Sequence, residues 1–265
     1  MSILSNTHGI LIALEGIDGA GKTTVANLLA DKFGKNGFDA VIVKAPDERF
    51  RDFLSRNSFS RPGKVLLYLA DMIESYRNII VPNLREGRVV ITDRSVLSTL
   101  VYQKLLPMYG NDPEACSLRK MIDALCDLVT QYDGDIRKVA LTVLLDIPAR
   151  VGMQRASSHV KDEYESADLE EWMLRVRMYR AMFDRIGEFR VDAVKLSADE
   201  VADAIFAEAL RRYALMFGVP EVDAQGEIQK GTLEDVQDND QESVGEDAPQ
   251  KNAAKANGHK EGANS

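Results

Sequence analysis

Short apolar runs alternate with longer amphipathic stretches along the first 220 residues of the chain. Five runs predict buried strands of a parallel sheet, where near-continuous apolar sequence is typical because helices cover both faces. They lie at 10–14, 40–43, 89–91, 139–145 and 194–196. All are far shorter than the roughly 18 apolar residues that a membrane span requires, so no membrane contact is expected.

The stretches between these runs carry apolar residues at helical spacing, which predicts amphipathic helices. They are expected at 22–35, 62–86, 97–105, 113–130, 150–157, 169–186 and 199–217. Ser60 can cap the second helix and Pro62 suits its first turn, whereas Pro82 should kink it. Residues 51–61 are polar and predict a surface loop or a short helix.

The alternation of strands and helices predicts an α/β fold whose parallel sheet is covered by helices on both faces. In such folds, ligands bind at the carboxyl ends of the strands. Side chains that directly follow a predicted strand are therefore the first candidates for a functional site.

Charge is distributed unevenly along the chain. Of its 42 acidic and 33 basic residues, 11 acidic and 4 basic ones lie in 221–265, a segment without aromatic residues. Such a segment cannot bury enough apolar surface to offset its conformational entropy, which predicts a folded domain at 1–220 and a disordered acidic tail at 221–265. The tail either keeps the protein soluble or docks a partner. The net charge of −9 disfavours nucleic-acid binding, whereas the folded part, with a net charge of only −2, permits anionic ligands near local basic groups.

Several features favour a cytoplasmic protein. The N-terminus lacks the basic, apolar and small-residue segments of a secretory signal. Cys116 and Cys126 lie ten residues apart without metal-ligand partners nearby, which favours reduced, buried thiols over a disulfide or a zinc site. The histidines His8, His159 and His259 show no ligand spacing.

The segment Gly16-Ile-Asp-Gly-Ala-Gly-Lys-Thr23 lies between the first predicted strand and the first predicted helix. This pattern in this position is typical of a loop that wraps around phosphates, whereas the alternative is a chance glycine-rich turn. The glycines let backbone N–H groups point at phosphate oxygens, and the helix N-terminus adds positive potential. Lys22 can bridge the β- and γ-phosphates, and Thr23 can hold Mg²⁺. The loop predicts a nucleoside triphosphate but not the acceptor.

A second polar segment follows the third predicted strand. Asp93 and Arg94 come directly after its apolar residues, so both should lie at the carboxyl edge of the sheet. Arg94 is suited to bind a phosphate with its forked guanidinium. Polar side chains at near-helical spacing then follow and can read the edge of a base: Ser98, Tyr102 and Gln103.

The segment 93–103 closely resembles the Asp-Arg-aromatic, Ser and Tyr-Gln signature of thymidylate kinases. Other segments resemble this family in the same order: the phosphate loop at 14–24, a post-strand segment at 46–49, a helix segment at 66–71, the stretch 144–155 that leads into the mobile lid, and the lid motif at 162–165. The resemblance spans roughly 10–210. It implies a P-loop three-layer α/β fold with a five-stranded parallel sheet, helices on both faces and a helical lid.

The resemblance implies an ATP-dependent dTMP kinase that uses Mg²⁺ and forms a homodimer. Implied ATP-binding residues are Gly16, Gly19, Ala20, Gly21, Lys22, Thr23, Thr24 and Arg155. Implied dTMP-binding residues are Asp18 for the sugar, Arg49 and Arg94 for the phosphate, and Tyr68, Ser98, Tyr102 and Gln103 for the base. Implied catalytic residues are Lys22, Arg94, Asp18 and Arg155, and the metal would be held at Thr23 and Asp93.

The chain departs from the family at several positions. Met72 stands where an arginine usually binds the acceptor phosphate, and either packs or marks an altered acceptor. Glu163 replaces a frequent lid arginine, and Gly19 stands where some members carry a loop arginine. Ser95 replaces an aromatic residue or histidine, which can widen the sugar pocket. The lid region offers as cations only Arg155, His159 and Lys161. Charge neutralisation therefore relies on fewer arginines, and losing one can cost several powers of ten in rate.

Some of these residues have a structural alternative. Tyr68 is either a base-stacking platform or a core aromatic. Arg94 either binds phosphate or forms an ion pair with Asp93 or Asp146, and Arg155 is either a lid residue or a solvated helix residue. The alternative functions are phosphorylation of another deoxynucleoside or modified pyrimidine nucleotide, and nucleotide binding with weak kinase activity.

Overall fold

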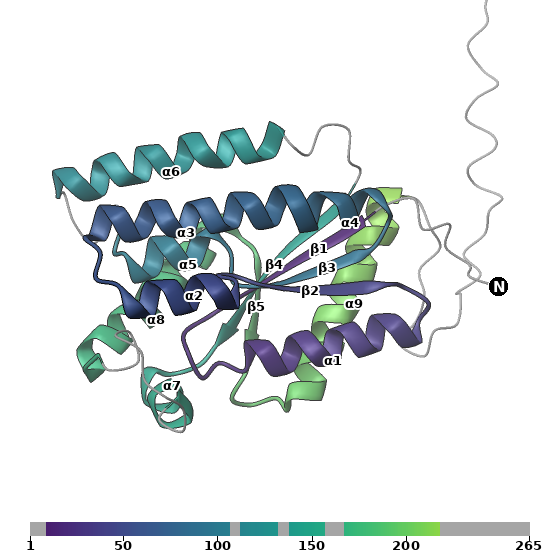
Figure 1. Cartoon of the computed structure of the whole chain (residues 1–265). Coiled ribbons are helices and arrows are strands. Elements are labelled where there is room, and N and C mark those ends of the chain that lie inside the picture. Colours follow the sequence, from purple (N-terminus) through teal and green to yellow (C-terminus); the bar gives the residue numbers. More distant parts are fainter. Residues whose placement is uncertain (1–8, 107–111, 132–137, 157–166, 218–265) are drawn as a thin grey trace, which may run out of the picture. The chain divides into compact units, whose positions relative to one another are not determined.

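A computed structural model describes residues 9–106, 112–131, 138–156 and 167–217, in which five parallel strands form one sheet (Figure 1). The strands are β1 (Gly9–Glu15), β2 (Ala40–Lys44), β3 (Val89–Asp93), β4 (Lys138–Asp146) and β5 (Phe189–Asp192), in the order β2-β3-β1-β4-β5. The central strand β1 pairs with β3 and β4, and its Ile10, Ile12 and Leu14 are almost fully buried. The sheet confirms the predicted α/β class.

Helices cover both faces of the sheet (Figure 1). α1 (Lys22–Lys35) and α9 (Ala198–Phe217) pack together through Phe33 and Phe206 on one face. On the other face, α3 (Arg61–Ser75) and α6 (Pro113–Gln131) share an apolar cluster. The described residues also form α2 (Glu48–Arg56), the π-helix η1 (Tyr76–Ile80), α4 (Val81–Arg85), α5 (Val96–Tyr102), α7 (Ala149–Ala156) and α8 (Leu169–Ile186).

The long helix predicted at 62–86 is divided into three segments. Ser60 caps α3 as predicted, accepting a hydrogen bond from the backbone N–H of Gly63, and Pro62 lies in its first turn. α3 then passes into η1, and α4 begins with Pro82 in its first turn. Because proline lacks an N–H and its ring crowds the preceding turn, the regular α-helical hydrogen-bond pattern is interrupted there. The change takes the form of a wider π-helical turn just before Pro82.

Two of the strand predictions need correction. The strand predicted as buried at 40–43 is β2, which lies at the sheet edge, and only its Val43 is buried. The last strand is β5, not 194–196, so that prediction is wrong. Val191 of β5 is buried, whereas Val194 and Leu196 are 44% and 37% exposed in the turn before α9. Apolar and polar residues alternate both in 189–192 and in 194–196, and the first of these stretches is the one that pairs with β4.

The remaining predictions have mixed outcomes. The short-helix alternative is correct for the start of 51–61, which belongs to α2. Cys116 and Cys126 are free thiols but are half-buried, not buried as predicted. Within the described ranges, no helix is long and apolar enough to cross a membrane. The predicted lid motif at 162–165, the three histidines and the acidic tail at 221–265 lie outside the described residues.

Candidate active site

A cleft of about 1210 Å³ opens at the carboxyl ends of the strands. The structure brings most of the predicted site residues together in its lining: Asp18, Gly19, Ala20, Gly21, Lys22, Thr23, Thr24, Tyr68, Asp93, Arg94, Ser98, Tyr102, Gln103 and Arg155. Arg49 belongs to α2, but its side chain lies outside the described part of the chain. The position of the cleft agrees with the general rule for ligand sites in parallel α/β sheets.

Glycines in the left-handed region shape the phosphate loop. Gly16, Gly19 and Gly21 have φ angles of 142°, 74° and 90°, which residues with a side chain rarely adopt. A Cβ at Gly19 would also lie 2.6 Å from the carbonyl oxygen of Gly152 in α7. An arginine at position 19, as in some family members, would therefore require α7 to move.

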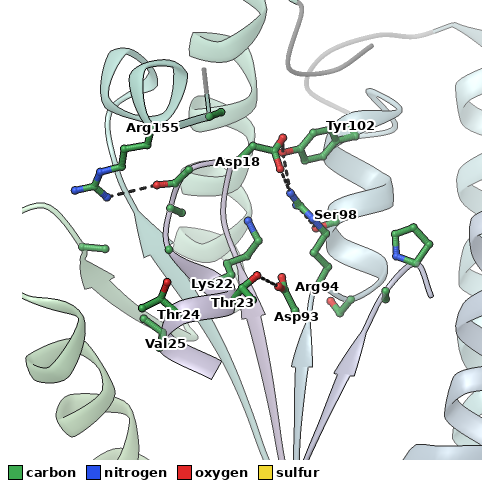
Figure 2. A pocket seen from close by; sticks show the side chains of 18 of the residues that line it. Asp18, Lys22, Thr23, Thr24, Val25, Asp93, Arg94, Ser98, Tyr102 and Arg155 are labelled. Carbon is green, nitrogen blue, oxygen red and sulfur yellow. Dashed lines mark hydrogen bonds and ion pairs between the residues drawn. The ribbon is translucent and has the colours of Figure 1, made fainter. Parts of the chain in front are cut away.

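Lys22 lies beneath the loop and is 7% exposed (Figure 2). Its Nζ donates hydrogen bonds of 3.0 Å to the carbonyl oxygens of Gly16 and Ile17. Burial, with a smaller contribution from Arg94, lowers the pKa of Lys22 to about 8, so the ammonium is largely protonated at neutral pH. Because both partners are neutral carbonyls, the ammonium can turn to phosphate oxygens without breaking an ion pair.

Thr23 and Asp93 lie side by side in the cleft (Figure 2). Thr23 Oγ1 donates a hydrogen bond of 2.7 Å to Asp93 Oδ2, which joins α1 to the end of β3. Hydroxyl and carboxylate oxygens are the donors that Mg²⁺ prefers, and Mg²⁺ usually keeps several waters and phosphate oxygens as its other ligands. The pair therefore fits Mg²⁺. The described residues contain no group of three or more His, Cys, Asp or Glu that could hold a metal.

Arg94 follows β3 with a φ angle of 84°, a left-handed conformation that is rare for a residue with a side chain. Its guanidinium forms an ion pair with Asp18 (Figure 2) and donates a hydrogen bond of 3.2 Å to the carbonyl oxygen of Gly16. Burial alone would raise the pKa of Asp18, but Arg94 and Lys22 lower it to about 2. This end of the cleft thus contains an ionised, paired carboxylate beside an arginine.

The structural alternative for Arg94 was an ion pair with Asp93 or Asp146, but both carboxylates bind other residues. Asp93 accepts its hydrogen bond from Thr23. Asp146, at the end of β4, binds Arg180 at 3.0 Å and Arg190 at 2.6 Å. Arg94 is therefore directed to the cleft and not to these strand ends.

The ring of Tyr102 contacts two guanidinium groups, with Arg94 and Arg175 centred 4.9 and 4.8 Å from the ring centroid. Its hydroxyl donates a hydrogen bond of 2.7 Å to Asp18 Oδ2. Sequence reasoning missed Arg175, which is 3% exposed and lies in α8. The available signal was its position on the apolar stripe of that helix, between Trp172 and Tyr179.

The hydroxyl of Ser98 is directed into the protein. It donates a hydrogen bond of 2.6 Å to Glu15 Oε2 and accepts one of 3.1 Å from Arg94. Glu15 is completely buried at the end of β1, and sequence reasoning also missed it. A carboxylate that directly follows buried apolar residues and precedes the phosphate loop was the signal for it.

Helices α2 and α3 form the wall opposite the phosphate loop. Tyr68 and Met72 of α3 are half-buried and line the cleft, and Tyr68 is absent from the apolar clusters of the core. Arg51 of α2 is exposed and also lines the cleft, although the sequence prediction named only Arg49. This wall therefore offers an aromatic ring, an apolar side chain and a cation.

The side chain of Arg155, in α7, reaches the phosphate loop (Figure 2). Its guanidinium donates a hydrogen bond of 3.4 Å to the carbonyl oxygen of Gly19. The other expected cations of this region, His159 and Lys161, lie outside the described residues. Within the described part, Arg155 is the predicted lid residue that lines the cleft.

Comparisons with known proteins agree with this geometry. The family model described as thymidylate kinase matches residues 14–205. A probable thymidylate kinase of Pyrococcus abyssi is 32% identical over 212 residues, which cover 76% of this chain and 95% of the relative. For a probable thymidylate kinase of Pyrococcus horikoshii, the values are 41% over 159 residues, with 56% and 70% covered. For a thymidylate kinase of Clostridium novyi, they are 27% over 208 residues, with 76% and 96% covered. The chain belongs to the thymidylate kinase family.

Proposed function

We propose that this protein is a dTMP kinase, which transfers the γ-phosphate of ATP to dTMP and yields ADP and dTDP. The observation that carries the proposal is a single cleft in which a phosphate loop with Lys22 adjoins the paired side chains of Asp18 and Arg94. The loop and Lys22 suit the phosphates of the donor, and Asp18 and Arg94 suit the sugar and the phosphate of the acceptor. Family membership supports this choice of donor and acceptor.

The donor end of the cleft would bind ATP. Backbone N–H groups of the loop and the start of α1 face the phosphates, and Lys22 neutralises charge on the transferring group. Thr23, Asp93 and phosphate oxygens would hold Mg²⁺, which supplies positive charge to the phosphates when bound. Thr24 adjoins this site, and Arg155 covers its outer side.

The acceptor end would bind dTMP. Asp18, held by Arg94 and Tyr102, would orient the sugar by accepting a hydrogen bond from its hydroxyl. Arg94 would bind the acceptor phosphate together with Arg49, and we add Arg51 because its side chain lines the cleft. With Met72 in place of an arginine, these cations of α2 carry more of the phosphate binding.

The base would lie between α3 and α5. Tyr68 provides an aromatic face for stacking, and Gln103 provides amide groups that can read a pyrimidine edge. Tyr102 closes the sugar side of this pocket with its ring. Ser98 takes part through Arg94, because its hydroxyl already contacts that guanidinium and Glu15.

Phosphoryl transfer requires little covalent work from the protein, so positioning and charge stabilisation supply the catalysis. Lys22 stabilises the developing charge from the donor side and Arg94 from the acceptor side. Arg155, on the lid side, would help to exclude water when the lid closes. We further propose a cytoplasmic homodimer, with 1–220 as the catalytic domain and 221–265 as an acidic tail without a catalytic role.

The proposal is tested by offering the purified full-length chain Mg-ATP with dTMP, dUMP, dCMP, UMP or thymidine and separating the products. We expect dTDP as the main product and no product from thymidine. Lys22→Ala should abolish transfer while the thermal unfolding profile shows a folded protein. Strong turnover of another acceptor without turnover of dTMP would exclude the proposed reaction.

A further inference from the structure

Glu15 is a buried charged residue for which the proposed reaction has no direct use. It ends β1, has 0% exposure, and precedes the phosphate loop. Its Oε1 accepts hydrogen bonds from the backbone N–H and the hydroxyl of Ser95, at 2.7 and 2.6 Å. Its Oε2 accepts from the hydroxyls of Ser98 and Tyr179, at 2.6 and 3.2 Å. A buried carboxylate is tolerated only when its oxygens are satisfied in this way.

The hydrogen bonds of Glu15 surround the strained residue Arg94. The N–H of Arg94 donates a bond of 3.0 Å to the carbonyl oxygen of Leu14, and the N–H of Ser95 donates to Glu15. Arg94 has a left-handed φ, and the N–H groups before and after its Cα are therefore both held by β1, through Leu14 and Glu15. A strained backbone of this kind persists only when its surroundings determine it.

Ser98 links Glu15 to the side chain of Arg94. A hydroxyl has one proton and two lone pairs. Ser98 gives its proton to Glu15, so one of its lone pairs can accept the N–H of Arg94 at 3.1 Å. The single proton of Tyr179 is shared between two acceptors, because its oxygen lies 2.8 Å from Ser98 Oγ and 3.2 Å from Glu15 Oε2. The carboxylate thus sets the direction of the lone pair that receives the guanidinium.

We propose that Glu15 is a positioning residue for Arg94: through Ser95 and Ser98 it fixes the turn after β3 and holds the guanidinium at the acceptor end of the cleft. This inference rests on the proposed function, in which Arg94 binds the dTMP phosphate. Glu15 itself touches no substrate, because it is completely buried.

The substitution Glu15→Gln keeps the shape of the side chain but leaves a single acceptor atom in place of two, which now accept three protons from Ser95 and Ser98 and share that of Tyr179. If the amide oxygen faces Ser95, the amide nitrogen can accept the proton of neither Ser98 nor Tyr179. If it faces Ser98, the nitrogen opposes the N–H of Ser95. Either orientation leaves a buried donor unsatisfied, which should release the turn that carries Arg94.

The test is a double-mutant cycle on dTMP binding, measured by calorimetry with Glu15→Gln, Arg94→Ala and the double variant. We expect Glu15→Gln to weaken dTMP binding about 10-fold when Arg94 is present and less than about 2-fold in the Arg94→Ala background. ATP affinity should change by less than about 2-fold. A merely structural role would weaken dTMP binding equally in both backgrounds, and that result would overturn the inference while leaving the proposed function intact.

A second double-mutant cycle combines Ser98→Ala with Arg94→Ala. Ser98→Ala removes the link between Glu15 and Arg94 but leaves Glu15 bound to Ser95 and Tyr179. This cycle therefore tests the inference even if Glu15→Gln fails to fold. Tyr179→Phe should give a smaller effect of the same kind. Tyr213→Phe, at another buried tyrosine located in α9, is its matched control and should leave dTMP binding unchanged. Failure of the wild-type protein to bind dTMP would overturn the proposed function and the inference together.

Discussion

The hydroxyl of Thr23 and the carboxylate of Asp93 form a hydrogen bond of 2.7 Å, although the two residues lie 70 positions apart in the sequence. The bond joins the first residues of α1 to the last residue of β3. It places next to the phosphate loop two oxygen atoms of the kind that Mg²⁺ prefers, so these two residues would hold the proposed metal.

The first prediction concerns this pair. Asp93→Asn keeps the shape of the side chain but removes its charge, so the Mg²⁺ concentration for half-maximal rate should rise about 10-fold. The measurement is a Mg²⁺ titration of the initial rate at saturating ATP and dTMP. Asp192→Asn, at the end of β5, is the matched control and should leave the titration unchanged. A shift of equal size in both variants would show that Asp93 has no special role at the metal.

The second prediction concerns Gly19. Gly19→Ala places a methyl group 2.6 Å from the carbonyl oxygen of Gly152 and also strains a φ of 74°, so α7 must move. Gly37→Ala is the matched control, because it has a φ of 83° and open space around the added methyl group. We expect Gly37→Ala to cost about 1 kcal/mol of unfolding free energy and Gly19→Ala about 3 kcal/mol, with weaker ATP binding. Equal losses in denaturant unfolding would refute the proposed contact with α7.

The third prediction concerns the stability of the protein in acid. The pKa of Asp18 lies at about 2 in the folded protein, below its ordinary 3.8, mainly because Arg94 outweighs the effect of burial. A lowered pKa stabilises the fold above about pH 4, and this contribution of up to about 2 kcal/mol is lost as the pH falls towards 2. Asp18→Asn should therefore flatten the dependence of unfolding free energy on pH in this range.

Glu208 titrates in the same range, because the hydrogen bond from Arg211 lowers its pKa to about 2. Glu208→Gln separates the two contributions, since it should remove only its own share of the pH dependence. Curves of unfolding free energy that run parallel for Asp18→Asn and the wild type would contradict the assignment to Asp18.

The fourth prediction distinguishes the arginines of α2. Arg51 lines the cleft, so Arg51→Ala should raise the KM for dTMP about 10-fold while the KM for ATP stays within about 2-fold. Arg56→Ala is the matched control, because Arg56 is exposed and pairs with Asp52 at 3.1 Å. Steady-state kinetics of both variants decide the point. If Arg49→Ala raises the KM for dTMP and Arg51→Ala does not, the assignment made from the sequence alone is the correct one.

Local signals explain which parts of the structure the sequence predicted. The apolar run of β1, the glycine-rich turn after it and the start of α1 at Lys22 are encoded by adjacent residues, and the structure confirms all three. The last strand was misplaced because Phe189–Asp192 and 194–196 both alternate, and only pairing with β4 decides between them. Tertiary pairing overrides a local pattern in such cases.

The site residues that sequence reasoning missed depend on contacts between distant segments. Glu15 meets Tyr179 from α8, and Arg175 meets Tyr102 from α5. Because neither contact joins residues at a fixed spacing in the sequence, no sequence motif predicts either of them. Arg51 was missed because it lines the cleft only as part of the short helix α2. The polar sequence of that segment did not decide between a surface loop and a helix.

The most direct test of the proposed reaction is the stoichiometry of its products at saturating dTMP. Wild-type protein with Mg-ATP should form one dTDP for each ADP released, and Lys22→Ala should form neither. Release of ADP without dTDP, or binding of ATP without either product, would contradict transfer of the γ-phosphate to dTMP in this cleft.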